Sequence, residues 1–177
     1  FFYYSVKPGE NSKNIETSIE VWKFLIDKGF KRTDLIINLG GGMITDLGGF
    51  VASTFMRGVK FVNVPTTLLG MVDASIGGKT GIDYREIKNI IGVFKFAKII
   101  LIDYRFLNTL TKRQKTAGYA EMIKHSLISE KSEFDVIKKV DSVDEIPHEM
   151  IYKSIATKIN IIDIDPHESS IRKFLNY

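Results

Sequence analysis

The feature that most constrains the fold is a triple glycine between an apolar, β-branched run and an apolar helical segment. The run Leu35–Leu39 has the length and composition of a buried strand, and Gly40–Gly42 follow it as a tight turn. The next segments are a helix that packs on a sheet, Met43–Phe55, and a second strand, Val59–Val64, ended by Pro65. Strand, turn, helix and strand in this order predict a βαβ unit with a parallel sheet.

The character of the chain changes near Asp103. Before it we expect a further helix at Ser12–Lys28 and a strand at Lys98–Ile102. We therefore predict an α/β, Rossmann-like domain over residues 1–103, followed by the beginning of an all-helical domain over residues 104–177. The helices expected in this second part are Leu110–Ser129, Glu133–Val140 and His148–Asp163.

Composition narrows the possible functions. Hydrophobic residues make up 44% of the 177, which excludes a disordered chain. The lack of cysteine excludes a thiol nucleophile and thiolate metal ligands, and it fits a cytoplasmic location. No apolar run approaches the ~18 residues of a membrane helix. The 25 Lys and Arg exceed the 21 Asp and Glu by four, but the charges are scattered. We therefore expect no nucleic-acid or membrane partner.

The glycine turn continues as Gly42-Met43-Ile44-Thr45-Asp46. A helix N-terminus after a glycine turn presents backbone N–H groups to an anion, as in a dinucleotide site. The usual G-x-G-x-x-G spacing is not met, because Thr45 stands at the third glycine. A plain strand-to-helix turn is the alternative. Asp46 is either a partner of the helix dipole or a ligand of a ribose hydroxyl.

Two later segments carry hydroxyl, lysine and glycine groups. Thr66 and Thr67 follow a strand end, where open α/β sheets bind ligands, although either hydroxyl could simply cap a helix. The Gly77-Gly78-Lys79-Thr80 string is similar to a P-loop, but Asp73 occupies the place of the required first glycine, so we reject a nucleoside triphosphatase. We expect an anion-binding glycine-rich loop here, with a flexible solvated loop as the alternative.

Polar residues of the expected helices allow several interpretations. Glu121, Lys124 and His125 share one helix face by their spacing. They form a surface ion pair, a Glu–His metal pair, or a metal-binding glutamate beside a substrate-binding lysine. Further along, Lys158, Arg172 and Asn176 are surface residues or anion and hydroxyl binders.

Together these segments resemble 3-dehydroquinate synthases, the cyclases of the shikimate pathway. The resemblance runs from about Pro8 to the last residue, and the VDASIGGKTG and AEMIK strings carry most of it. The matching segments are Gly40–Phe50, Phe55–Ile82, Lys88–Gly92, Leu101–Leu110 and Ala117–Ile128.

The resemblance implies a tightly bound NAD, a divalent metal (zinc or cobalt) and a homodimer, whose subunit boundary in the family lies near the arginine that matches Arg57. It implies one metal ligand in this chain, Glu121. The positions that match NAD contacts are Glu10, Lys13, Gly42, Met43, Ile44, Thr45, Asp46, Thr66, Thr67, Lys79, Lys88, Phe106, Leu107, Asn108 and Thr109. Those that match the substrate site are Arg57, Asp73, Lys79, Asn89, Lys124, Lys158, Arg172 and Asn176.

The implied reaction converts 3-deoxy-D-arabino-heptulosonate 7-phosphate, a phosphorylated seven-carbon keto sugar acid, into 3-dehydroquinate and phosphate. NAD transiently oxidises a secondary alcohol, phosphate is eliminated, and an aldol addition closes the ring. Alternatives are a 2-deoxy-scyllo-inosose or valiolone-type sugar phosphate cyclase, a metal-dependent polyol dehydrogenase and a non-catalytic basic module.

Three departures from the family pattern stand out. Thr45 and Ser170 replace expected glycines. The two zinc histidines of the family follow an L-N-F-G-H-T motif, which here is only Leu175–Tyr177. His125, His148 and His167 do not match those histidines. We therefore expect an internal fragment of a longer protein, with its first strand missing, that is inactive alone and binds zinc weakly.

Overall fold

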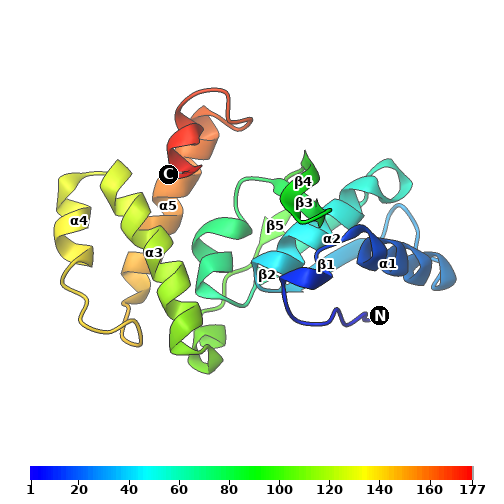
Figure 1. The fold of residues 1–177 in the computed structure, drawn as a ribbon, viewed down its shortest axis with the longest axis horizontal. Helices are drawn as coiled ribbons and strands as arrows, with labels where there is room; N and C mark the ends of the chain where they lie inside the picture. The colour runs from blue at the N-terminus through cyan, green and yellow to red at the C-terminus, as the bar shows by residue number, and fades with distance from the viewer. Residues whose placement is uncertain (177) are drawn as a thin grey trace. The chain divides into compact units, whose positions relative to one another are not determined.

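The computed structural model describes residues 1–176, apart from the side chain of residue 131. It divides into two compact units (Figure 1). Unit 1 comprises Phe1–Pro65 and Gly78–Leu101, and unit 2 comprises Thr66–Gly77 and Ile102–Tyr177. The domain boundary near Asp103 stays a prediction, because compactness alone does not define an independently folding domain.

Unit 1 contains the predicted parallel sheet. Its strands are β1 (Leu35–Gly40), β2 (Lys60–Pro65) and β5 (Ile99–Ile100), in the order β1-β2-β5. Helix α2 (Gly42–Thr54) connects β1 to β2, and helix α1 (Ile15–Asp27) precedes the sheet. The predicted βαβ unit is confirmed. The third strand is shorter than the predicted Lys98–Ile102.

A buried amide pair fixes the register of β1 and β2. Asn38 lies opposite Asn63, and its Nδ2 atom donates to Asn63 Oδ1 at 2.9 Å. Gly48 of α2 makes room for this pair because it has no side chain. A Cβ added to Gly48 would lie 2.0 Å from Asn38 Oδ1. Both amides are buried, so their mutual hydrogen bond offsets part of the cost of desolvating them.

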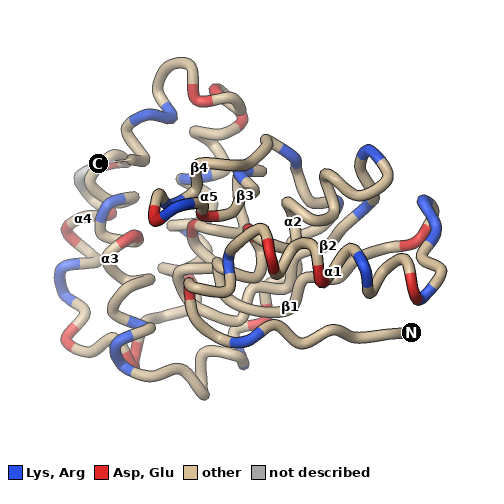
Figure 2. The backbone as a smooth tube through the Cα atoms, turned by 45° about the vertical axis from the view of Figure 1, so that its right-hand side comes forward, with Lys and Arg blue, Asp and Glu red and all other residues tan. Residues whose placement is uncertain are grey.

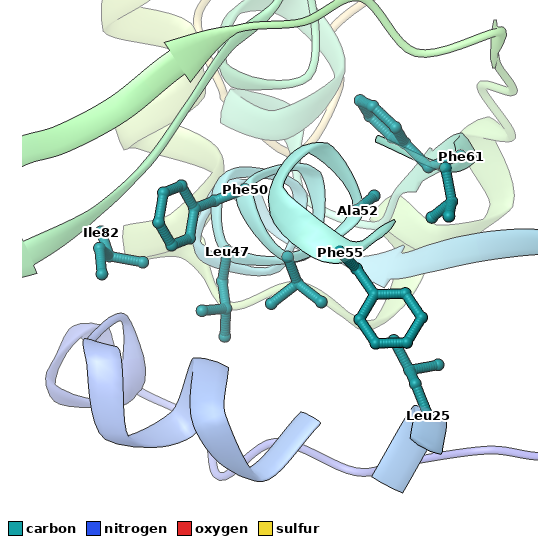
Figure 3. Close-up of a cluster of buried hydrophobic side chains, with 9 residues drawn as sticks. Leu25, Leu47, Phe50, Ala52, Phe55, Phe61 and Ile82 are labelled. Carbon is teal, nitrogen blue, oxygen red and sulfur yellow. The ribbon is translucent and has the colours of Figure 1, made fainter. Parts of the chain in front are cut away.

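The core of unit 1 forms around α2. Figure 3 shows Leu47 and Phe50 of α2 beside Ile82, and Phe55 beside Leu25 of α1. A fully buried side chain of this kind contributes up to about 1.5–3 kcal/mol. The buried members are Leu25, Leu47, Phe50, Val51, Ala52, Phe55, Val59, Phe61 and Ile82.

The glycine-rich segment is a bend at Gly77 and Gly78, and from Lys79 onward, where we also expected a loop, the chain forms an antiparallel hairpin. Anion binding by this segment stays a prediction. Strand β3 (Lys79–Tyr84) pairs with β4 (Ile87–Phe94), and the turn residues Arg85 and Glu86 both have positive φ. Gly81 lies opposite Gly92, where an added Cβ would come within 2.2 Å of the Thr80 carbonyl oxygen. The glycines permit close approach of two strands, and periodicity alone does not distinguish this role from that of a flexible loop.

Unit 2 is built from helices. The three α-helices are α3 (Lys112–Ile128), α4 (Lys131–Ile137) and α5 (His148–Ile164), each within a few residues of its predicted position. Short turns accompany them: η3 (Gly70–Ala74), a π-helical turn, and the 3-10 turns η4 (Tyr104–Thr109) and η5 (Ile171–Asn176). Gly118 of α3 packs directly on Leu68, since an added Cβ would lie 2.5 Å from Leu68 Cγ.

Acidic and basic residues are both scattered along the two units (Figure 2). Within the described part of the chain, no helix has the length and apolarity needed to cross a membrane.

Candidate functional site

In unit 1, the candidate anion site lies where β1 passes into α2. The strand ends at Gly40, and Gly41 is the N-cap residue of the helix. An added Cβ on Gly40 would lie 2.6 Å from Ile44 Cγ1, so this position requires glycine. Thr45 is buried and its hydroxyl donates to the Gly42 carbonyl at 2.9 Å, which explains why threonine is tolerated here. The first-turn N–H groups are the donors that an anion would use.

Lys13 is the centre of a buried charge network beside this turn. Its ammonium is 3% exposed and lies 2.5 Å from Glu10 Oε1, 3.5 Å from Asp46 Oδ2 and 3.6 Å from Asp83 Oδ1. It also donates to Asn89 Oδ1 at 2.8 Å. Burial alone would lower the pKa of Lys13, but the three carboxylates outweigh it and raise the pKa. Lys13 is therefore charged at neutral pH.

The same network fixes the backbone of Asn89. This residue has φ 54°, and its N–H donates to Asp83 Oδ1 at 2.8 Å. The N–H of Asp83 in turn donates to the Lys13 carbonyl at 2.8 Å. Asp83 is a site residue that the sequence analysis missed, because only the hairpin register brings it to Asn89.

Three other predicted positions of unit 1 are exposed: Arg57, Lys79 and Lys88. Arg57 has a positive φ of 63° at the turn after α2. Lys79 begins β3 and Lys88 lies in β4. Their predicted contacts with NAD, substrate or a second subunit stay predictions.

In unit 2, Lys158 of α5 is bonded to Asp73 of η3. Its Nζ atom lies 2.5 Å from both the backbone carbonyl oxygen and Oδ1 of Asp73. Burial alone would raise the pKa of Asp73, but the Lys158 ammonium outweighs it and lowers the pKa below its usual range. Asp73 is therefore a carboxylate at neutral pH.

The helix face predicted from spacing is present on α3. Lys124 pairs with Glu121, and its Nζ also donates to the Leu175 carbonyl at 2.6 Å. His125 is 1% exposed, and its Nδ1 lies 2.7 Å from Ser154 Oγ. Burial, supported by the nearby Lys158 and Lys124, lowers the pKa of His125 to about 4 against the attraction of Asp73. The imidazole is therefore neutral at physiological pH.

Asp73, Glu121 and His125 form a candidate metal site. One ligand atom from each lies within 4.8 Å of the others. Among the described residues, His125 Nε2 is buried without a hydrogen-bond partner, and Glu121 Oε2 is buried and ion-paired with Lys124. Two carboxylates and one neutral imidazole suit zinc or cobalt, so these residues fit a divalent metal. The resemblance implied Glu121 alone and helical spacing left a Glu121–His125 pair open, and the structure adds Asp73 as a third candidate.

The remaining histidines lie elsewhere in unit 2. His148 stacks on Tyr104 with ring centroids 4.3 Å apart, and His167 belongs to the turn after α5. Neither belongs to the metal-type cluster found among the described residues.

Two predicted substrate residues near the C-terminus are engaged within unit 2. The Arg172 side chain is 2% exposed, and its guanidinium donates to the carbonyl oxygens of Gly77 and Pro166. Asn176 donates to Glu168. Ser170, the second replaced glycine, donates its N–H to Asp165. Tyr177, which completes the shortened family motif, lies outside the described residues.

The other predicted NAD positions also fall in unit 2. The Thr67 hydroxyl accepts from the N–H of Gly70 at 3.0 Å, as a helix cap does. Thr66 directly follows β2. Phe106, Leu107, Asn108 and Thr109 lie in η4, where the Thr109 hydroxyl donates to the Phe106 carbonyl. Their NAD contacts stay predictions.

A cavity of about 320 Å³ lies between α3, α4 and α5. Met122 and Ile137 are buried in its lining, which also includes His125 and Ser154. None of the residues predicted to contact substrate lines it, so this cavity is not the candidate substrate site.

This fold resembles that of solved sugar phosphate cyclases. 2-epi-5-epi-valiolone synthase from Streptomyces hygroscopicus matches with a TM-score of 0.87 and 29% identity, over 97% of this chain and 50% of that one. A 2-deoxy-scyllo-inosose synthase matches with a TM-score of 0.87 and 25% identity, over 97% of this chain and 48% of that one. The fold class is therefore that of the sugar phosphate cyclases, as predicted.

Family models narrow the assignment. The model of the 3-dehydroquinate synthase N-terminal region matches residues 3–117, and that of the C-terminal region matches residues 118–177. The chain belongs to the 3-dehydroquinate synthase family, which confirms the resemblance.

Curated relatives agree with this assignment. The 3-dehydroquinate synthase of Sulfurisphaera tokodaii is 42% identical over 100% of this chain and 52% of its own length. That of Sulfolobus acidocaldarius is 43% identical over 97% of this chain and 50% of its own length. A bifunctional 3-dehydroquinate synthase/phosphatase of Fusobacterium nucleatum is 42% identical over 99% of this chain and 27% of its own length. The chain thus spans about half the length of the single-function relatives.

Proposed function

We propose that the complete polypeptide carrying this chain is a 3-dehydroquinate synthase. It would convert 3-deoxy-D-arabino-heptulosonate 7-phosphate into 3-dehydroquinate and phosphate. The observation that carries the proposal is the group formed by Asp73, Glu121, Lys124, His125 and Lys158. It combines metal-type donors with cations suited to an anionic sugar. The synthase relatives are 39–43% identical, against 25–29% for the sister cyclases, which supports this substrate over theirs.

Unit 1 supplies groups for NAD. The first-turn N–H groups at Gly42–Asp46 suit the pyrophosphate, and Lys13 holds Asp46 in place. Two solved sister cyclases were crystallised with NAD and with zinc or cobalt. When bound, NAD supplies a transient oxidation of a substrate alcohol, and the metal supplies Lewis-acid polarisation.

Unit 2 supplies the metal ligands and cations. Glu121 and His125 present buried acceptor atoms, and Ser154 orients the imidazole through Nδ1. Asp73 binds Lys158 Nζ beside them. Lys124 is partly exposed and is suited to bind a substrate carboxylate or phosphate.

A coupled assay tests the proposal. The complete polypeptide should release phosphate and form 3-dehydroquinate from the heptulosonate phosphate, and Glu121→Gln should lose both activities. Turnover of a hexose phosphate or of a seven-carbon sugar phosphate without a carboxylate would instead identify a sister cyclase. Net NADH formation would identify a dehydrogenase, because a cyclase recycles its NAD.

Two further points stand as proposals. The 177-residue chain alone should release no phosphate and bind zinc weakly, which isothermal titration calorimetry measures. The complete protein should be a homodimer, which light scattering coupled to size exclusion measures.

A further inference from the structure

Asp165, at the end of α5, is a buried carboxylate that accepts four hydrogen bonds. Oδ1 accepts from the N–H of Ser169 at 2.8 Å and from its hydroxyl at 3.0 Å. Oδ2 accepts from the N–H of Ser170 at 2.7 Å and of Arg172 at 3.1 Å. Burial alone would raise the pKa of Asp165, but these hydrogen bonds outweigh it and lower the pKa well below its usual range. An ionised carboxylate therefore closes the turn from Asp165 to Arg172.

This turn directs the Arg172 guanidinium to two backbone carbonyls. Nη2 lies 2.7 Å from the Gly77 oxygen, and Nη1 lies 2.5 Å from the Pro166 oxygen. A planar guanidinium presents its N–H donors in a rigid fork, so making both bonds requires a defined placement of the Arg172 side chain. Asp165 holds that backbone through the N–H of Arg172 itself.

The lack of a side chain at Gly77 leaves room for the Arg172 guanidinium. It has φ 101°, and an added Cβ would lie 2.4 Å from Arg172 Nη2 and 2.8 Å from Ile162 Cδ1. Four residues earlier in the same segment is Asp73, held by Lys158. The segment from Asp73 to Gly77 is thus fixed at both ends by cations.

We propose that Asp165 is a positioning residue, which acts through Arg172 and Gly77 to hold Asp73 in place. The proposal rests on the proposed function where it concerns catalysis. A plain helix-terminal cap would stabilise α5 without affecting Asp73. If Asp165 is a positioning residue, its substitution changes the environment of Gly77 and Asp73, and it does so only while Arg172 is present.

The test is a double-mutant cycle in the complete polypeptide, with Asp165→Asn, Arg172→Gln and the double variant. Asn keeps the size of Asp165 but lacks one of its two acceptor oxygens. We expect Asp165→Asn to shift the amide NMR signals of Gly77 and Asp73 and to lower kcat/KM about tenfold or more. The double variant should be no slower than Arg172→Gln alone. The matched control is Ser169→Ala, which removes one hydroxyl donor and should change kcat/KM little.

Other outcomes overturn the proposal. If the loss of kcat/KM in the double variant equals the product of the two single losses, Asp165 acts independently of Arg172. If the amide signals of Gly77 and Asp73 do not shift, Asp165 is a plain helix cap. If Asp165→Asn does not fold, Gly77→Ala tests the same contact, and an unchanged kcat/KM there would also refute it. A wild-type protein without cyclase activity would refute the proposed function, and the NMR signals would still decide the role of Asp165.

Discussion

Lys158 donates one ammonium group to two acceptors of Asp73, its backbone carbonyl and its carboxylate, at 2.5 Å each. The Lys158 side chain is 7% exposed and that of Asp73 is 28% exposed. This bond joins α5 to η3, and it lowers the pKa of Asp73 so that this carboxyl stays ionised.

Replacing Lys158 by Met should destabilise the protein by about 3 kcal/mol, because a largely buried carboxylate loses its counter-ion. Urea unfolding followed by circular dichroism measures this. The control is Lys153→Met on the same helix, whose ion pair with Glu149 is exposed. It should cost less than about 1 kcal/mol. Equal losses for both variants would contradict a special role of the Asp73 bond.

Replacing Gly118 by Ala should destabilise the protein by about 1–3 kcal/mol, although alanine favours a helix. The added methyl would lie 2.5 Å from Leu68 Cγ and 2.6 Å from the Leu69 nitrogen, so backbone must move. Thermal unfolding measures the loss. Thr116→Ala, on an exposed position of the same helix, should change the stability by no more than about 0.5 kcal/mol. A stabilised Gly118→Ala variant would show that α3 does not pack this closely.

His125 should make the metal-free protein sensitive to mild acid. Its pKa is about 4 in the folded state against 6.5 for a free histidine, so the unfolded chain takes up its proton first. The stability contribution is complete above pH 6.5 and falls as the pH drops toward about 4, by about 3 kcal/mol in all. Urea unfolding across this range measures it. His125→Gln should flatten this part of the profile, and an unchanged slope in that variant would assign the effect to other groups.

Replacing Lys13 by Met should destabilise the protein by about 2 kcal/mol, because Glu10, Asp46 and Asp83 would then repel one another. These carboxylates are 20–41% exposed, which limits the cost. NAD binding, measured by calorimetry in the complete polypeptide, should weaken as Asp46 loses its ion pair with Lys13. Lys7→Met, at an exposed position, is the control for charge alone. Equal changes in stability and NAD binding for the Lys13 and Lys7 variants would show that the charge network around Lys13 has no special role.

Local patterns predicted much of this structure. The βαβ order follows from the run Leu35–Leu39, the glycine turn and Pro65. The shared face of Glu121 and His125 follows from helical spacing. These features depend on residues close in sequence, where periodicity and turn chemistry act directly.

The rest depends on pairing across long stretches of chain. The β3–β4 hairpin has no glycine at its turn residues, Arg85 and Glu86, so the usual turn signal is missing. The partnership of His125 with Ser154 joins two helices, and that of Arg172 with Gly77 spans 95 residues. Such contacts arise from packing, which no local pattern encodes.

The hydrogen-bonded amides of Asn38 and Asn63 define one register of β1 against β2, and the absence of a side chain at Gly48 leaves the space that Asn38 occupies. Sliding β1 past β2 by one residue would separate the two buried amides and break their hydrogen bond. The shift would also move Gly40, at the end of β1, by about 3.3 Å along the strand, so that it would no longer lie opposite Pro65. This buried hydrogen bond thereby helps to set the position along the sheet at which β1 ends and the chain continues into the first turn of α2.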